Sequence, residues 1–160
     1  MSLAVTIHIV GLAAHAETER VCTLMREYAA LPHVAGRWLT VEQDLAALPH
    51  PFVAPSGALL LATDGVQPLG CGGLVALSPG VGEIKRVYVR PVARGRGVGE
   101  ALTVTLLAEA KRLGFHRVRL DTAPELVAAQ ALYSRLGFVR IPPYRDGLLT
   151  DAVCFERPVA

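Results

Sequence analysis

Short apolar or alternating stretches bounded by turn residues predict that this chain forms a β-sheet. The predicted strands are residues 3–10, 58–63, 69–77, 82–90, 117–121, 138–141 and 152–156. The second and third strands are separated by Asp64-Gly65, a dipeptide typical of tight hairpin turns. The sheet should therefore contain an antiparallel meander.

Four longer segments carry the three- and four-residue spacing of apolar positions, or the start signals, that predict helices. Two of them show an apolar stripe, at residues 16–30 (Val21, Leu24, Met25, Tyr28) and 98–113 (Val98, Ala101, Leu102, Thr105, Leu106). The other two are predicted to start at capping boxes, Thr40 with Gln43 and Thr122 with Glu125. They should end before Pro49 and at Leu136, and residues 31–38 should be irregular.

The order of these elements predicts the fold class. A strand and two helices precede three strands, and a helix, a strand, a helix and two strands follow. A helix between two strands indicates a parallel crossover, whereas the meander is antiparallel. We expect an α/β protein of the α+β type, with a mixed sheet of about seven strands flanked by about four helices. A chain of 160 residues is long enough for one domain over residues 1–160.

Composition narrows the class of function. The net charge is +2, without a basic run, which argues against a nucleic-acid partner. No apolar stretch has the length of a membrane span. The cysteines Cys22, Cys71 and Cys154 are odd in number and far apart, and the histidines lack ligand spacing, so we expect free thiols, a cytoplasmic location and no metal.

The candidate chemistry lies in Arg94-Gly95-Arg96-Gly97-Val98-Gly99, between a predicted strand and a predicted helix. Glycines at such a turn let the free amides at the helix start approach a ligand, and a phosphate is the preferred one. Arg86 and Arg90 fall nearby and should add charge-assisted bonds together with Arg94 and Arg96. The dinucleotide fingerprint would need glycine where Glu100 stands, and the P-loop's Gly-Lys-Ser/Thr is absent.

This turn matches the Q/R-x-x-G-x-G/A signature of the GNAT superfamily of N-acetyltransferases. Its surroundings, GEIKRVYVRPVARGRGVGEAL and AQALYSRLGF, resemble the family in order and separation, and the resemblance covers roughly residues 57 to 157. It implies the GNAT fold, in which the central parallel strands splay apart, and acetyl-coenzyme A as co-substrate. The implied coenzyme contacts are the pantetheine strand (Val87, Tyr88, Val89) and the pyrophosphate turn (Arg94, Gly95, Arg96, Gly97, Val98, Gly99, Glu100).

The resemblance also implies catalytic roles. Tyr133 stands where the family places the residue that faces the thioester sulfur, although a tyrosine packed in the core is the alternative. Glu83 stands where many relatives have the base that removes a proton from the amine, and a strand glutamate paired with Lys85 or Arg86 is the equal alternative. A backbone N–H near Val89 would stabilise the oxyanion.

Other implications are less specific. Many relatives carry asparagine where this chain has Leu126, so that coenzyme contact should be missing. The acceptor, a small-molecule or peptide amine, should meet residues 31–38 and 142–151, where Arg37, Trp38, Tyr144 and Arg145 could bind a carboxylated amine. Cys71 and Cys154 should pack in the sheet. An acyl-coenzyme A sensor without turnover and a nucleotide-dependent enzyme remain alternatives. A homodimer is common in the family, but the sequence does not indicate the oligomeric state.

Overall fold

A computed structural model of the protein describes residues 4–159, with the side chains of residues 35–40 outside the description. Within this range seven strands form one sheet: β1 (Thr6–Ile9), β2 (Gly57–Thr63), β3 (Pro68–Ser78), β4 (Val81–Val89), β5 (Arg117–Thr122), β6 (Val139–Ile141) and β7 (Val153–Pro158). The helices are α1 (His15–Ala29), α2 (Trp38–Ala47), α3 (Val98–Arg112) and α4 (Val127–Arg135), with 3-10 helices η1 (Pro32–Arg37) and η2 (Pro91–Ala93). The predicted mixed sheet is confirmed.

The sheet has the order β1-β2-β3-β4-β5-β7-β6, and β4 and β5 form its parallel pair. Helix α3 joins them, as the crossover predicts. The meander prediction is also confirmed: Gly65 has φ +94°, and the Asp64 carboxylate accepts hydrogen bonds from the amides of Val66 (3.0 Å) and Gln67 (2.7 Å). Local turn chemistry therefore fixes the register of β2 and β3.

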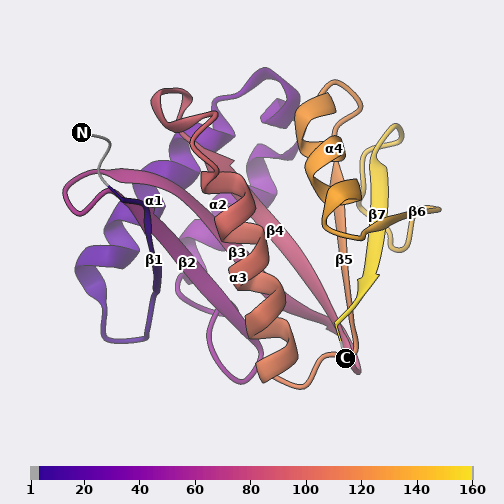
Figure 1. The fold of residues 1–160 in the computed structure, drawn as a ribbon, viewed down its shortest axis with the longest axis horizontal. Coiled ribbons are helices and arrows are strands. Elements are labelled where there is room, and N and C mark those ends of the chain that lie inside the picture. The colour runs from indigo at the N-terminus through magenta and orange to yellow at the C-terminus, as the bar shows by residue number, and fades with distance from the viewer. Residues whose placement is uncertain (1–3, 160) are drawn as a thin grey trace.

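Two apolar clusters pack on opposite faces of the sheet. Alternation along β2 separates them, because Leu60 belongs to the cluster that contains α3, whereas Leu59 and Leu61 belong to the cluster that contains α1 and α2. Figure 1 shows α3 crossing one face, with α1 and α2 behind the sheet. The molecule thus has three layers, and both faces of the central strands are covered.

Both predicted capping boxes are wrong. The 3-10 helix η1, in the segment predicted to be irregular, runs directly into α2 at Trp38, so Thr40 lies inside the helix. Thr122 is the last residue of β5 and pairs with Val153, and α4 begins only at Val127. In both places neighbouring structure, which the local motif does not reveal, displaces the helix start. Within the described residues no helix is both long and apolar enough to cross a membrane.

Glu156 on β7 connects this strand to its neighbour β5 through two ion pairs. Its carboxylate accepts hydrogen bonds from Arg119 Nε (2.7 Å) and Arg117 Nη1 (2.6 Å), both on β5. These bonds, chiefly that of Arg119, hold the pKa of Glu156 below its ordinary value. The ionised carboxylate is therefore more favourable in the folded protein than in the unfolded chain.

We expect Glu156→Gln to lower the free energy of unfolding by about 1 kcal/mol at pH 7. The stabilisation is complete above the pKa of an unfolded glutamate, about 4.3, and disappears as the pH falls through the lower folded value. Urea unfolding at pH 7 and near pH 3 measures this, with Glu19→Gln on exposed α1 surface as the control. An equal loss at both pH values would contradict a charge effect.

Candidate active site

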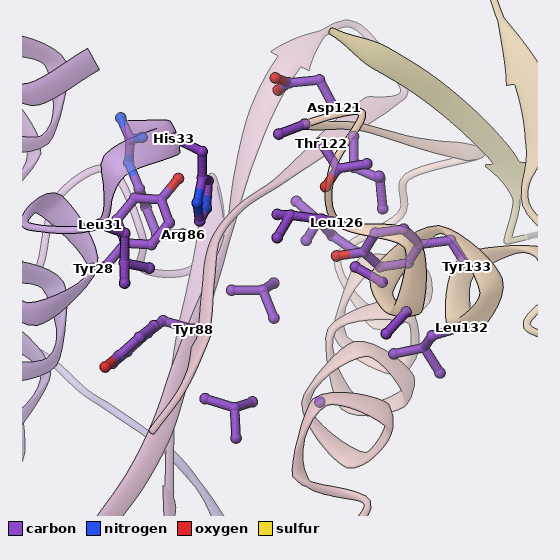
Figure 2. Close-up of a pocket in the computed structure, with 18 of the residues that line it drawn as sticks. Tyr28, Leu31, His33, Arg86, Tyr88, Asp121, Thr122, Leu126, Leu132 and Tyr133 are labelled. Atoms are coloured by element: carbon purple, nitrogen blue, oxygen red, sulfur yellow. The ribbon is translucent and has the colours of Figure 1, made fainter. Parts of the chain in front are cut away.

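A cavity of about 930 Å³ opens where β4 and β5 separate. The parallel pairing covers only Val81–Glu83 against Arg117–Arg119, and beyond it the strands diverge. Side chains and backbone from α1, β4, the start of α3, the end of β5, α4 and the loop before β7 (residues 142–152) line the space. Figure 2 shows Tyr28, Leu31 and His33 on one wall and Thr122, Leu126, Leu132 and Tyr133 on the other.

The amino-terminal end of α3 forms one end of the cavity. Gly95 and Gly97 both have φ +76°, a conformation that glycine adopts without strain. The first amides of any helix lack an intrahelical acceptor. Here the N-cap is Gly97, which provides no side-chain acceptor for them either. These amides and the helix dipole favour an anion. The turn therefore exposes amides at the helix start, as the sequence indicates, and phosphate binding there stays a prediction.

Two of the four arginines predicted near the turn, Arg86 and Arg94, line the cavity. Arg90 donates to Glu27 (2.6 Å from Nη2 to Oε1) and to the carbonyl of Pro68, and Arg86 donates to Asp44 (2.8 Å). The two guanidinium groups therefore attach β4 and the residue that follows it to α1, α2 and β3. Arg90 and Arg96 are not among the lining residues. Spacing along the chain did not reveal these acidic partners, which lie 42 and 63 residues away.

A β-bulge shapes the β4 wall. Lys85 pairs with Gly73 and Tyr88 pairs with Cys71, so an advance of three residues along β4 corresponds to only two residues along β3. Within this bulge Arg86 has φ +59°. Beyond the bulge the Arg90 amide donates to Leu69 on β3. Because amide directions alternate along a strand, the Val89 amide points away from β3, toward the side where β5 has separated.

The three predicted pantetheine residues therefore contribute differently. Val87 and Val89 are half-buried cavity residues. Tyr88 also contacts the cavity, but its hydroxyl donates to Glu27 on α1 (3.2 Å), and its ring lies 6.3 Å from that of Tyr28. The side chain of Tyr88 thus fixes the strand against α1, which leaves the β4 backbone as the group available along the gap.

Tyr133 lies on the opposite wall, on α4. Its ring packs at 5.7 Å from Phe138 and 5.9 Å from Phe155, and the residue is 7% exposed. The chain reverses at Gly137 (φ +87°), and the Phe138 amide donates to the Tyr133 carbonyl, which brings Phe138 against the tyrosine. Burial raises the pKa of Tyr133 to about 12. In Figure 2 its hydroxyl points into the cavity, so the phenol is a neutral donor there.

Glu83 lies at the last parallel pair of β4 and β5, opposite Arg119. Its carboxylate Oε2 accepts hydrogen bonds from the Tyr144 hydroxyl (2.6 Å) and from Arg145 Nε (2.7 Å). The side chain is 3% exposed, and Glu83 is not among the residues that line the cavity. The alternative pairing with Lys85 or Arg86 is wrong, because both cations lie against Asp44 instead.

Of the four residues predicted to meet the acceptor, the structure describes the side chains of Tyr144 and Arg145. Tyr144 and Arg145 interact with Glu83, and Arg145 also contacts the cavity. The side chains of Arg37 and Trp38 lie outside the described residues. Cys71 and Cys154 are buried, as predicted, and burial raises the pKa of Cys71 to about 12.

Tyr28 and Asp121 are among the residues of the cavity wall to which the sequence analysis assigns no functional role. Tyr28 belongs to the α1 stripe, which the sequence predicts to be core, and Asp121 is the last residue of a predicted strand. The position of Asp121 beside the parallel crossover is the signal that could have identified it, because ligands bind beyond the carboxyl ends of such strands.

Comparisons with known proteins identify the family of the chain. A family model described as "Acetyltransferase (GNAT) family" matches residues 19–138. An uncharacterised N-acetyltransferase of Schizosaccharomyces pombe is 35% identical over 115 residues, 71% of each chain. A mycothiol acetyltransferase of Pseudarthrobacter chlorophenolicus is 35% identical over 118 residues, 70% of this chain, and the match spans only 36% of that protein.

Solved structures share the fold. A GNAT acetyltransferase of Staphylococcus aureus superposes with a TM-score of 0.81 at 19% identity, over 98% of this chain and 100% of that one. An acetyltransferase of Salmonella typhimurium, solved with its cofactor acetyl-coenzyme A, gives 0.67 at 20% identity, over 98% and 95%. Since the family model covers more than half of the chain, the protein belongs to the GNAT family of acetyltransferases.

Proposed function

We propose that the protein is an N-acetyltransferase that moves the acetyl group of acetyl-coenzyme A to a primary amine of a small molecule or peptide, by direct transfer in a ternary complex. One observation carries the proposal. A single cavity has a glycine-rich helix start at one end and a buried, neutral tyrosine on its wall. The first feature suits the pyrophosphate of the coenzyme, and the second suits a leaving thiolate.

The coenzyme has a continuous path along this cavity. The amides at the start of α3 receive the pyrophosphate, and Arg94 and Gly95 lie beside them. The pantetheine amides follow β4, where the backbone of Val87 and Val89 faces the gap as an unpaired strand edge would. This arrangement leads the thioester toward Tyr133.

Direct transfer requires few groups. The amine nitrogen attacks the thioester carbon, and the Val89 amide donates to the oxygen that becomes negative. The C–S bond then breaks, and the Tyr133 hydroxyl donates to the thiolate. Full proton transfer from a phenol of pKa about 12 to a thiolate of pKa about 8.5 is uphill by about 5 kcal/mol. Tyr133 therefore acts mainly as a hydrogen-bond donor.

The base of the reaction is a separate question. Glu83 remains the candidate that the family resemblance predicts. The engagement of its carboxylate by Tyr144 and Arg145 means that an amine must reach it through water or after the loop moves. Glu83 as the base is therefore a prediction that needs its own test.

The phosphate turn gives a matched test of coenzyme binding. We expect Gly97→Ala to weaken acetyl-coenzyme A binding at least about tenfold, because alanine at φ +76° costs about 1–2 kcal/mol and the turn relaxes away from the ligand. Gly114→Ala, at φ +88° just beyond the other end of α3, imposes the same strain outside the cavity. Calorimetric titration should show the loss only for Gly97→Ala; equal affinities in both variants would contradict the assignment.

A thiol-release assay with acetyl-coenzyme A tests the function across amino acids, polyamines, amino sugars and peptide amino termini. We expect at least one amine to accelerate thiol release, with the acetylated amine found by mass spectrometry. Melting temperatures distinguish the alternatives, because a ligand at 100 times its Kd adds about 2.7 kcal/mol of stability. A shift with acetyl-coenzyme A but no turnover with any amine would indicate a sensor. A shift with ATP or NAD instead would indicate a nucleotide enzyme.

A further inference from the structure

A second carboxylate stands closer to the cavity than Glu83. Asp121 lies on β5 two residues beyond Arg119, the last residue that pairs with β4. It is half-buried and lines the cavity, whereas Glu83 is not part of that lining. Figure 2 shows the Asp121 carboxylate pointing from the β5 wall toward the space that faces Tyr28 and His33.

The alternation of side chains along β5 determines the face of the sheet on which Asp121 lies. Val118 and Leu120 point into the core cluster that contains α3. Asp121 shares the other face of β5 with Arg119, whose guanidinium binds Glu156 and lies 5.7 Å from the Tyr144 ring. Asp121 therefore faces the side covered by α1, η1 and the loop before β7, opposite α3, which holds the phosphate turn.

Electrostatics place the same carboxylate near the proposed chemistry. Burial, then the charge of Tyr28 and, third, the negative charge of Asp121 raise the pKa of Tyr133. Burial and then Glu83 raise the pKa of Tyr144, and Glu83 raises the pKa of Arg145 against the opposing effect of burial; Asp121 is a smaller cause in the upward direction at both. Asp121 is thus within electrostatic reach of both the residue proposed to meet the sulfur and the loop proposed to meet the acceptor.

We propose that Asp121 is the catalytic residue that binds the acceptor nitrogen and accepts its proton, and that Glu83 instead positions the loop that carries Tyr144 and Arg145. This inference rests on the proposed acetyl transfer. It assigns the two carboxylates different tasks, according to which of them lies on the cavity wall and which is held by the loop.

The step balances with the groups present. A neutral amine forms the C–N bond with the thioester carbon, and its nitrogen becomes positively charged as the bond forms. One proton passes from that nitrogen to the Asp121 carboxylate, directly or through one water. The C–S bond breaks with its electron pair on sulfur, Tyr133 donates a hydrogen bond to the thiolate, and the proton on Asp121 returns through solvent to give the thiol.

Glu83 suits a positioning role. One oxygen, Oε2, receives both the Tyr144 hydroxyl and Arg145 Nε, from a loop about 60 residues further along the chain. Arg145 also contacts the cavity, so this attachment brings the loop to the cavity wall. Losing the carboxylate should loosen the loop and weaken acceptor binding more than it slows the chemical step.

The experiment compares Asp121→Asn, Asp121→Glu and Glu83→Gln, using the best amine from the screen at saturating acetyl-coenzyme A. We expect Asp121→Asn to lower kcat about 100-fold, Asp121→Glu to recover at least about tenfold of that loss, and the Kd of acetyl-coenzyme A to stay within about twofold. Glu83→Gln should mainly raise the acceptor KM. Glu19→Gln, on the exposed surface of α1, is the control for an acid-to-amide change.

Each result decides between the two carboxylates. A kcat of Asp121→Asn within about threefold of wild type, with Glu83→Gln about 100-fold slower, overturns the inference and favours Glu83 as the base. If Asp121→Asn melts at a much lower temperature than wild type, the experiment uses Asp121→Ala with added formate instead. A kcat that rises with the formate concentration supports the inference. A kcat that does not change with formate opposes it. Thiol release by no amine in the wild-type protein overturns the proposed function and the inference together.

Discussion

Tyr133→Phe is expected to lower kcat by about 10²–10³-fold, the usual effect of removing one hydrogen-bond donor from a developing anion in a water-poor site. The ring contacts with Phe138 and Phe155 remain, because phenylalanine keeps the same shape. Coenzyme affinity should therefore change less than about threefold, and the melting temperature should stay near that of wild type. Steady-state thiol release and calorimetric titration measure the two quantities separately.

The pH dependence adds a second criterion. Because burial raises the pKa of Tyr133 to about 12, the hydroxyl stays protonated from pH 7 to pH 10. Its contribution should be constant over that range, so the ratio of wild-type to Tyr133→Phe kcat should not vary with pH. A ratio that falls toward one at pH 9 to 10 would show that the tyrosine ionises there and would contradict a neutral donor.

A hydroxyl control keeps the interpretation specific. Thr23→Val removes an exposed hydroxyl that donates to the Glu19 carbonyl within α1, away from the cavity lining. It should leave kcat unchanged. If Tyr133→Phe also leaves kcat within about threefold of wild type, Tyr133 is a core tyrosine, which is the alternative that its contacts with Phe138 and Phe155 allow.

The sequence predicted those parts of the fold that local patterns determine. Periodicity identified the strands and the helices α1 and α3, and Asp64-Gly65 identified the hairpin, because each signal lies within a few residues of the structure it produces. The helix starts at Thr40 and Thr122 failed for the converse reason. A preceding 3-10 helix and a strand pairing with β7 displaced them, and neither is visible in a four-residue motif.

The candidate site divides in the same way. The glycine turn was predictable, because positive φ at Gly95 and Gly97 depends on the residue type itself. The partners of Arg86, Arg90 and Glu83 were not, because each lies more than 40 residues away and is brought close only by the packing of α1, α2 and the loop before β7. A charged side chain near a motif therefore says little about its role until its partner is known.

No sequence pattern predicts a role for the glycines of β3, although they determine how closely the layers approach. A Cβ at Gly72 would lie 3.1 Å from a methyl group of Leu106 on α3, and one at Gly73 would meet the Phe52 ring on the other face. At Gly70 the Cβ would lie 2.6 Å from the backbone carbonyl oxygen of Tyr88. A backbone atom of β4 cannot move aside as a side chain can, so Gly70 should be the residue of the three where substitution affects β4 most directly.

Gly70→Ala is accordingly expected to lower the free energy of unfolding by about 3 kcal/mol, or about 10 °C in melting temperature. Because Val89, the residue after Tyr88, lines the cavity, the displaced strand should also bind acetyl-coenzyme A more weakly. Gly11→Ala is the matched control, since no atom lies within 4 Å of its added Cβ, and it should stay within about 0.5 kcal/mol of wild type. Urea unfolding and calorimetry measure both effects. Equal stability of the two variants would mean that β3 and β4 are not packed as closely as the register between Gly70 and Val89 implies.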